Sequence, residues 1–355
     1  MNAFDLNELG WTPELEEHMA PHRAAGYVPG RVAVQHRGGY AVLTENGETT
    51  ARLTGRMRSD GHGLPAVGDW LALRPLPNEP ETMVAAILPR TSKFSRHEAG
   101  KVTREQVVAA NVDVALLVAA LNHDLNPRRL ERYITTAWSG GATPVIVLTK
   151  PDLCDDVDAA LAAVEPVALG IPIHVVNGLT GEGIEEVARY LGGNKTLALL
   201  GSSGAGKSTL LNRIAGIELQ RVAEIRHDGK GRHTTTERHL FLVPGGGLVL
   251  DTPGMRELQL WDDDSMDQTF ADVAELAEHC RFDDCTHEHE PGCAVIAAND
   301  AGTLSAERLA SYRKLQRELL HLRIKQDKRA AAEQKRHYKQ MTKSYKQMTK
   351  TARPD

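Results

Sequence analysis

The chain has 355 residues, 41% of them hydrophobic, and a formal net charge of −5. Its length allows two or three domains with separate cores, and no apolar run approaches the ~18 residues that span a bilayer. Because the N-terminus shows no basic segment followed by an apolar one, we expect a cytoplasmic protein with no membrane partner rather than a secreted one.

The first third of the sequence predicts an N-terminal extension followed by a small barrel. Residues 1–29 form the extension, with a short amphipathic helix expected over residues 12–25. Within residues 30–90, five short strands are predicted, at 31–35, 40–44, 49–53, 69–74 and 83–88. Asn46-Gly47 between the second and third strands is typical of a tight hairpin. Five short strands favour an oligonucleotide-binding (OB) barrel, although an SH3-like barrel would show the same pattern.

A polar linker, residues 91–105, leads to an α/β domain over residues 106–262. Asn126-Pro127 supplies a helix N-cap followed by proline in the first helical turn. Continuous apolar runs, typical of strands buried on both faces, alternate with helical stretches, which predicts a doubly wound, largely parallel sheet. The predicted strands are 114–121, 144–148, 171–176, 197–200, 239–243 and 248–250, and the helices lie near 127–138, 154–163, 183–191 and 207–215.

One of these strand-to-helix turns matches the phosphate-binding loop pattern G-x-x-x-x-G-K-[ST]. Its glycines allow backbone N–H groups and the helix N-terminus to face phosphate oxygens. Lys207 is expected to reach the β- and γ-phosphates, and Ser208 to ligate Mg²⁺. The nucleotide-binding residues of this segment are Gly201, Ser202, Ser203, Gly204, Ala205, Gly206, Lys207, Ser208 and Thr209.

Two further segments are expected to sense the γ-phosphate. Asp251 begins an Asp-Thr-Pro-Gly turn after an apolar strand, where its carboxylate can hold the Mg²⁺ shell and the N–H of Gly254 can contact the phosphate. Upstream lies Gly-Arg-His-Thr-Thr-Thr, residues 231–236, which has the polar composition of a switch loop. Thr235 is our candidate for completing the Mg²⁺ shell.

A guanine-reading segment follows the strand at 144–148. It consists of Thr149, Lys150, Pro151 and Asp152. The Asp152 carboxylate can accept hydrogen bonds from the ring N–H and the exocyclic amine of guanine, donors that adenine does not present. Asn177-Gly178 stands where many GTPases have Ser-Ala against the base, which is a departure from the usual pattern. Since this guanine reader precedes the phosphate loop, the order of the GTPase motifs is circularly permuted.

The C-terminal part combines a candidate metal site with positive charge. Cys280, Cys285, His287 and Cys293 supply three thiolates and an imidazole, which suits a closed, structural zinc site, with His289 as a substitute for His287. Cys154 stands apart and is expected to be an inert buried thiol. Residues 263–330 are therefore expected to form a helical zinc-binding domain, and 331–355 a basic tail. Residues 305–355 hold 15 Lys/Arg against 5 Asp/Glu, which favours a polyanionic partner over a merely solvated face.

Taken together, these motifs resemble those of the ribosome small-subunit-dependent GTPase A family over roughly residues 30–320. The resemblance implies an OB barrel, a circularly permuted GTPase domain and a zinc-bearing helical domain. It further implies GTP hydrolysis in late maturation of the bacterial small ribosomal subunit, stimulated by that subunit and its RNA. We expect a monomer that uses Mg²⁺ with GTP and one structural Zn²⁺.

Two other functions remain open from the sequence. One is a GTP-sensing RNA-binding placeholder that does not hydrolyse GTP, and the other is a P-loop ATPase, which Asp152 opposes. Met255 occupies the position after Gly254, where many GTPases carry a glutamine that orients the attacking water. We take His233 as the candidate group for that role, because a neutral imidazole can accept a proton from water. A packing role for His233 is the alternative.

Overall fold

The computed structural model describes residues 3–36, 38–55, 57, 63–76, 79–97, 105–216, 238–251 and 264–326. The chain divides into two compact units. One comprises Met1–His97 and Glu105–Gln259, and the other comprises Glu98–Arg104 and Leu260–Asp355. No helix among the described residues is long and apolar enough to cross a membrane.

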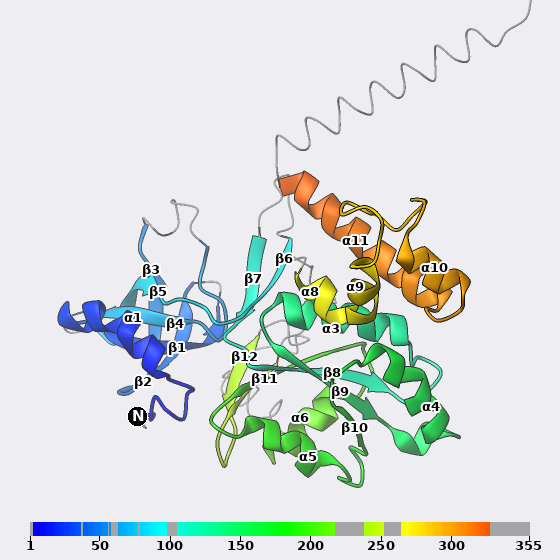
Figure 1. Cartoon of the computed structure of the whole chain (residues 1–355). Helices are drawn as coiled ribbons and strands as arrows, with labels where there is room; N and C mark the ends of the chain where they lie inside the picture. The colour runs from blue at the N-terminus through cyan, green and yellow to red at the C-terminus, as the bar shows by residue number, and fades with distance from the viewer. Residues whose placement is uncertain are drawn as a thin grey trace, which may run out of the picture. The chain divides into compact units, whose positions relative to one another are not determined.

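The N-terminal strands close into a five-stranded barrel (Figure 1). Neighbours pair in the order β1-β2-β3-β5-β4, and β4 pairs back with β1; β3 and β5 run parallel, and the other pairs are antiparallel. This strand order, with β3 parallel to β5, confirms the OB-type barrel over the SH3-like alternative. The strands are β1 (Val28–Gln35), β2 (Tyr40–Thr44), β3 (Gly47–Leu53), β4 (Trp70–Pro75) and β5 (Glu81–Ile87).

The tight hairpin between β2 and β3 follows from local chemistry. Thr44 pairs with Gly47, and Gly47 has φ +106°, a conformation that glycine adopts without a Cβ penalty. The Thr44 hydroxyl donates to the carbonyl oxygen of Gly47 and accepts a hydrogen bond from the N–H of Asn46. These contacts fix the register between β2 and β3.

A second set of strands forms a doubly wound sheet in the order β10-β9-β8-β11-β13-β12. All neighbours are parallel except β12 and β13. Its strands are β8 (Val114–Ala120), β9 (Thr143–Thr149), β10 (Ile173–Val176), β11 (Thr196–Gly201), β12 (His239–Leu242) and β13 (Leu248–Asp251). The predicted largely parallel sheet is confirmed.

Helices cover both faces of this sheet (Figure 1). Alternate residues of β8 enter different cores: Leu117 packs in the cluster that holds Ile134 of α3, whereas Leu116 packs in the cluster that holds Leu210 of α6. That alternation is the pattern of a strand buried on both faces. The helices are α3 (Pro127–Ser139), α4 (Val157–Val164), α5 (Ile184–Ala188) and α6 (Lys207–Ala215), with 3₁₀ turns η1 (Pro151–Leu153), η2 (Glu165–Val167) and η3 (Arg189–Leu191).

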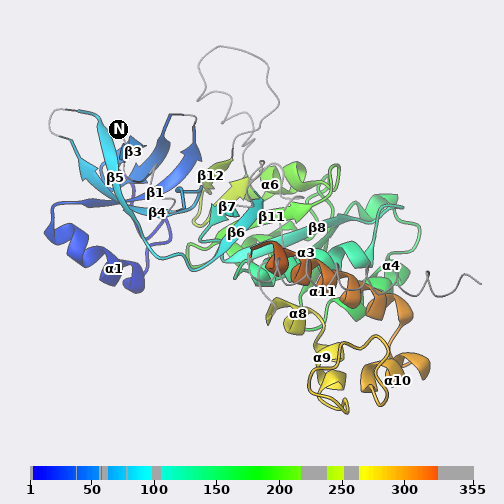
Figure 2. The ribbon, with the colours of Figure 1, turned by 90° about the horizontal axis from the view of Figure 1, so that it is seen from above.

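The N-terminal extension packs onto this unit. Its helix α1 (Pro13–Ala24) begins after Thr12, whose hydroxyl accepts a hydrogen bond from the N–H of Leu15, and it lies beside the barrel strands (Figure 2). Leu9 is fully buried, and Trp11 meets Trp70 edge to face at 4.7 Å between ring centroids. The extension therefore belongs to the hydrophobic core of the barrel.

A buried guanidinium lies where the extension, the barrel and the sheet meet. Arg31 of β1 donates to backbone oxygens of Leu9, Gly68 and Asn111 and to the hydroxyl of Thr196, the first residue of β11. Burial lowers the pKa of Arg31 to about 10, and the charges of Asp113 and Asp69 oppose that shift. The side chain is thus still charged at neutral pH. Val34 of β1 also pairs with His239 of β12. The barrel strands and the doubly wound sheet therefore form one continuous sheet of 11 strands.

The segment predicted as a linker contains a strand instead. Residues Lys93–His97 form β6, which pairs antiparallel with β7 (Glu105–Ala110). Phe94 of β6 is buried, and the Lys93 ammonium pairs with the Glu105 carboxylate at 2.8 Å. The polar composition of residues 91–105 predicted a linker. The contacts that stabilise β6 come from β7, and the composition of the segment alone does not show them.

The described part of the second unit is helical. It contains α8 (Asp264–Thr269), α9 (Ala271–Ala277), α10 (Ala294–Asp300) and α11 (Ala306–Gln326) around a core that includes Phe270 and Val295. Buried Arg308 makes two hydrogen bonds to the Asp272 carboxylate, at 3.0 and 2.8 Å, and lies over the Phe270 ring. The basic tail, residues 331–355, lies outside the described residues.

Candidate functional site: a nucleotide pocket and a Cys3His cluster

The nucleotide-binding motifs gather at one edge of the doubly wound sheet. The phosphate loop follows β11, the guanine reader follows β9, Asn177-Gly178 follows β10, and Asp251 ends β13. These strands are parallel in one sheet, so their carboxyl ends lie at the same edge, where α/β folds bind ligands. A motif order that is permuted along the chain therefore still brings the motifs to one edge of the sheet.

The phosphate loop has the conformation that its glycines allow. Gly204 and Gly206 have φ of +75° and +90°, and a Cβ on Gly201 would lie 2.2 Å from the carbonyl oxygen of Val118. The Lys207 ammonium donates to the carbonyl oxygens of Gly201 and Ser202, at 2.9 and 2.6 Å. Lys207 thus lies across the loop, at the start of α6, where a phosphate would also meet the helix N-terminus.

A side chain that the sequence analysis missed supports this loop. The Ser202 hydroxyl lies 3.1 Å from the carboxylate of Asp124, in the turn after β8, and Arg129 of α3 makes two hydrogen bonds to the same carboxylate. The hydrogen bonds from Arg129 and Ser202 lower the pKa of Asp124 to about 2. No motif marks Asp124; only its place after the strand next to β11 could have pointed to it.

Thr149 joins the guanine reader to the phosphate loop. Its hydroxyl lies 2.6 Å from the carbonyl oxygen of Ala205 and 3.3 Å from that of Ala119. A Cβ on Gly206 would lie 3.3 Å from the same hydroxyl, which shows how closely the two segments approach. Thr149 is buried, so this hydrogen bond is shielded from water. The hydroxyl therefore joins the predicted guanine reader to the predicted phosphate loop.

The guanine reader turns sharply after Thr149. Lys150 has φ +59°, a left-handed conformation, and Pro151 and Asp152 follow in the 3₁₀ turn η1 with the Asp152 side chain exposed. On the neighbouring strand, Val176 pairs with Thr149, so Asn177 and Gly178 begin their loop beside this turn. The arrangement brings Asp152 and the loop that begins at Asn177 to the same edge of the sheet.

Asn177 acts within its own loop. Its side-chain oxygen accepts hydrogen bonds from the N–H groups of Leu179, at 2.9 Å, and Thr180, at 3.2 Å. The N–H of Gly178 has no acceptor among the residues that the structure describes. Gly178 therefore presents the backbone donor of this loop, and Asn177 shapes the loop around it.

Asp251 lies near the phosphate loop. Burial raises the pKa of its carboxyl group, and the charge of Lys207 acts in the opposite direction. A partly buried carboxylate close to this ammonium is suited to a divalent cation, whose charge would offset the cost of burial. Three predicted site residues, His233, Thr235 and Gly254, lie outside the described residues.

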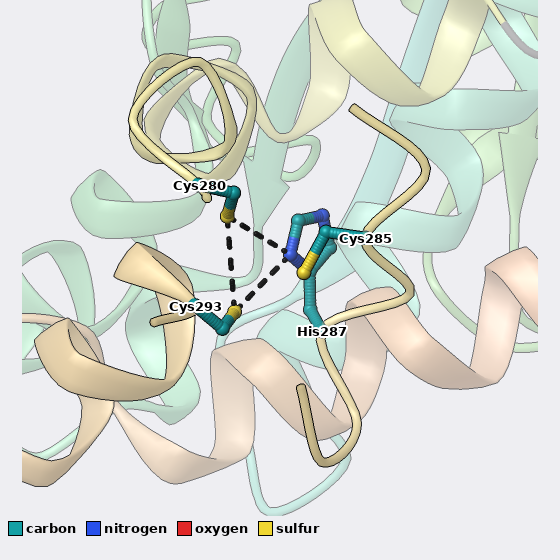
Figure 3. A group of neighbouring side chains, drawn as sticks. All are labelled: Cys280, Cys285, His287 and Cys293. Carbon is teal, nitrogen blue, oxygen red and sulfur yellow. Dashed lines mark hydrogen bonds between the residues drawn. The ribbon is translucent and has the colours of Figure 1, made fainter. Parts of the chain in front are cut away.

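The second unit brings together the four predicted zinc ligands (Figure 3). The Sγ atoms of Cys280 and Cys293 lie 3.8 Å apart, and Nδ1 of His287 lies 3.6 Å from the first and 3.4 Å from the second. A tetrahedron with Zn–S of ~2.3 Å and Zn–N of ~2.0 Å requires separations of ~3.8 Å and ~3.5 Å. The ligand atoms of all four residues, Cys285 included, lie within 4.8 Å of one another.

The chain holds this cluster in place from several sides. The guanidinium of Arg313 on α11 donates two hydrogen bonds to the carbonyl oxygen of His287, which has φ +58°. The Glu290 carboxylate accepts from N–H groups in the same loop. Burial raises the pKa of the Cys285 thiol to about 11, so a metal would have to displace its proton. His289 is outside the cluster. Cys154 is half-buried rather than buried as predicted, and it packs against the hydrophobic core.

Comparison with known proteins agrees with this arrangement. The RsgA GTPase family matches residues 87–261. A Lactiplantibacillus plantarum protein named "Small ribosomal subunit biogenesis GTPase RsgA 2" is 46% identical over 323 residues, covering 89% of this chain and 90% of its own. "Small ribosomal subunit biogenesis GTPase RsgA" of Syntrophotalea carbinolica is 44% identical, with 95% of each chain covered. The chain belongs to the RsgA GTPase family.

Solved structures support the same assignment of the fold. YjeQ from Thermotoga maritima superimposes with a TM-score of 0.62 at 28% identity, covering 83% of this chain and 99% of its own. YloQ, described as a circularly permuted GTPase, has a TM-score of 0.59 at 24% identity and shares the fold. The ABC transporter family also matches residues 184–352, a range that includes the phosphate loop. That match lacks the guanine reader at residues 149–152, which the RsgA GTPase match includes.

Proposed function

We propose that this RsgA-family GTPase binds GTP through the edge of the doubly wound sheet and hydrolyses it while associated with the maturing small ribosomal subunit. The observation that carries the proposal is the hydrogen bond between Thr149 and Ala205, which joins a guanine reader to a phosphate loop. In this assignment Asp152 reads the guanine edge, Gly178 donates its N–H to the base, and Lys207 binds the β- and γ-phosphates.

Magnesium is assigned to the phosphate side of the pocket. Ser208, Asp251 and Thr235 would hold it directly or through water, and the bound ion neutralises charge on the phosphate oxygens. The partly buried carboxylate of Asp251 and its approach to Lys207 fit such an ion. Gly254 is assigned to the γ-phosphate and His233 to the attacking water, both on the basis of sequence.

Zinc is assigned a structural role. The four protein ligands would complete a tetrahedral shell and would leave no open position for substrate. Binding would release protons from the thiols, because thiolate is the form that ligates the metal. The ion would then fix the loop between α9 and α10 against α11, through the hydrogen bonds of Arg313 to His287.

Ribosomal RNA is the proposed polyanionic partner. The relatives named above act in small-subunit biogenesis, and a five-stranded OB barrel is a common platform for single-stranded nucleic acid. The positive charge of residues 305–355 adds salt-dependent affinity for phosphate backbones. We propose that the protein works as a monomer in the cytoplasm, where ribosomal subunits are assembled. The domain boundaries are proposed as predicted from sequence, except that Lys93–His97 of the predicted linker form β6.

The nucleotide assignment is tested by changing Asp152 to Asn. The amide can donate a hydrogen bond where the carboxylate accepted one, so the variant is expected to lose affinity for GTP and gain affinity for xanthosine triphosphate. Asp155→Asn, in the same exposed stretch after η1, is the matched control and should leave the preference for guanine unchanged. Equal binding of ATP and GTP by the wild-type protein would disprove the guanine assignment and favour a P-loop ATPase.

A further inference from the structure

In the loop after β10, two successive peptide groups have both their N–H and their C=O hydrogen-bonded to side chains. Asn177 accepts the N–H of the Gly178–Leu179 peptide and the N–H of the Leu179–Thr180 peptide. The carbonyl oxygens of the same two peptides, those of Gly178 and Leu179, accept hydrogen bonds from Arg213. Each peptide plane is thereby fixed from opposite sides.

Arg213 reaches this loop from the helix that follows the phosphate loop. Its Nε lies 3.0 Å from the carbonyl oxygen of Gly178, and its Nη2 lies 2.6 Å from that of Leu179. The planar guanidinium presents both donors in a fixed geometry, which a lysine ammonium cannot reproduce. Arg213 belongs to α6, the helix that Lys207 begins.

The same helix also limits how far the loop can move. A Cβ on Gly178 would lie 2.9 Å from Cγ2 of Thr209, so the backbone of the loop is pressed against α6. The peptide that precedes these two, Asn177–Gly178, keeps its carbonyl oxygen engaged with the N–H of Gly181. Its own N–H, that of Gly178, has no acceptor among the described residues.

We propose that Arg213 is a positioning residue for base selectivity: it holds the loop so that the N–H of Gly178 is oriented toward the O6 oxygen of guanine. This inference rests on the proposed guanine binding at Asp152. Arg213 does not touch the nucleotide in this scheme. It acts by keeping a backbone donor pre-oriented, which removes part of the ordering cost that binding would otherwise incur.

The expected effect is modest, because Arg213 is exposed and its hydrogen bonds compete with water. Loss of one oriented neutral hydrogen bond corresponds to about 3- to 10-fold in affinity. That loss should appear only for ligands that carry an acceptor at position 6 of the purine. A side chain that merely supported the fold would change the affinity for all nucleotides alike.

The test compares GDP with 2-aminopurine riboside diphosphate, which retains the 2-amino group and the phosphates but lacks O6 and also the ring N–H that is assigned to Asp152. Each variant is therefore compared with wild type for the same ligand, so that the missing ring N–H cancels. Dissociation constants are measured by equilibrium titration for wild type, Arg213→Gln, Arg213→Lys and the control Arg189→Gln. Arg189 is another exposed arginine of the same unit, with a 3.3 Å ion pair to Glu185 in the helix preceding η3.

Arg213→Gln is expected to weaken GDP binding about 3- to 10-fold and to change binding of the analogue less than 2-fold. Arg213→Lys should give an intermediate loss, and Arg189→Gln should match wild type. Equal weakening of both ligands, or no weakening of GDP, would overturn the positioning role of Arg213. Wild-type protein that binds both diphosphates equally would overturn the proposed contacts of Gly178 to O6 and of Asp152 to the ring N–H.

Discussion

Replacement of Arg31 by Met should destabilise the first unit strongly, because it leaves buried acceptors without donors. Arg31 is 2% exposed, and its guanidinium donates to oxygens from four segments of the chain. Gly68 keeps a second donor in the side-chain amide of Asn111. The carbonyl oxygens of Leu9 and Asn111 have no other donor among the residues described.

The loss in the free energy of unfolding can be estimated from these two unsatisfied oxygens. A buried polar group left unsatisfied costs ~1–3 kcal/mol, so the pair predicts a loss of ~2–6 kcal/mol in the free energy of unfolding. For a unit of this size, such a loss lowers Tm by at least ~5 °C. Buried ion pairs can often be replaced by apolar residues without cost, but here the acceptors are backbone oxygens that the substitution cannot remove.

The assay is thermal unfolding of the full chain, with Arg52→Met as the control. Arg52 also lies in the barrel, but its side chain is 55% exposed and contacts Glu81 at 2.7 Å, an exposed pair worth at most ~1 kcal/mol. Nucleotide affinity of Arg31→Met should stay within about 3-fold of wild type, because Thr196 begins β11 and the phosphate loop follows its end. A Tm no lower than that of Arg52→Met would refute the reasoning.

Four further changes, at the zinc site, Thr149, the basic tail and His233, have expected outcomes that can be measured. Cys285→Ser should lower zinc content, measured by metal analysis, and destabilise the second unit while GDP affinity stays close to wild type; full zinc occupancy in the variant would contradict the four-ligand site. Thr149→Val removes the donor to Ala205 and should weaken GDP binding by about 5- to 100-fold in a fluorescence titration, whereas Thr149→Ser should retain it; equal behaviour of the two would exclude the hydroxyl. Deleting residues 331–355 should flatten the dependence of log affinity for ribosomal RNA on log salt, and an unchanged slope would mean that the tail makes no phosphate contacts. His233→Ala should keep GTP affinity and lower stimulated turnover by on the order of 10²-fold, so wild-type turnover in this variant would leave His233 a packing role.

Features set by local chemistry could be predicted from the sequence. Asn126 caps α3 through hydrogen bonds from the N–H groups of Arg128 and Arg129, as Asn126-Pro127 indicated. The positive φ angles of Gly204 and Gly206 follow from the phosphate-loop pattern. Each of these features depends on residues only a few positions apart. The residues that cause it therefore stand together in the sequence motif.

Features that depend on distant partners could not be predicted. Arginine is mostly exposed in proteins, and nothing local marks Arg31 as buried, because its acceptors come from four other parts of the chain. The pairing of β6 with β7 was missed because the polar pattern of residues 91–105 favours a loop until the partner strand is present. Arg213 was missed for a similar reason, since its acceptors are backbone oxygens in a loop that precedes it by more than 30 residues.

The central claim is that this protein hydrolyses GTP under the control of the small ribosomal subunit. The direct measurement is multiple-turnover phosphate release from GTP, with and without purified small subunits, at fixed ionic strength and with ATP as the competing substrate. We expect slow hydrolysis by the protein alone, acceleration of at least about 10-fold by the subunits, and no comparable turnover of ATP. Phosphate release that stays at background with saturating subunits would contradict the account and favour a GTP-sensing placeholder.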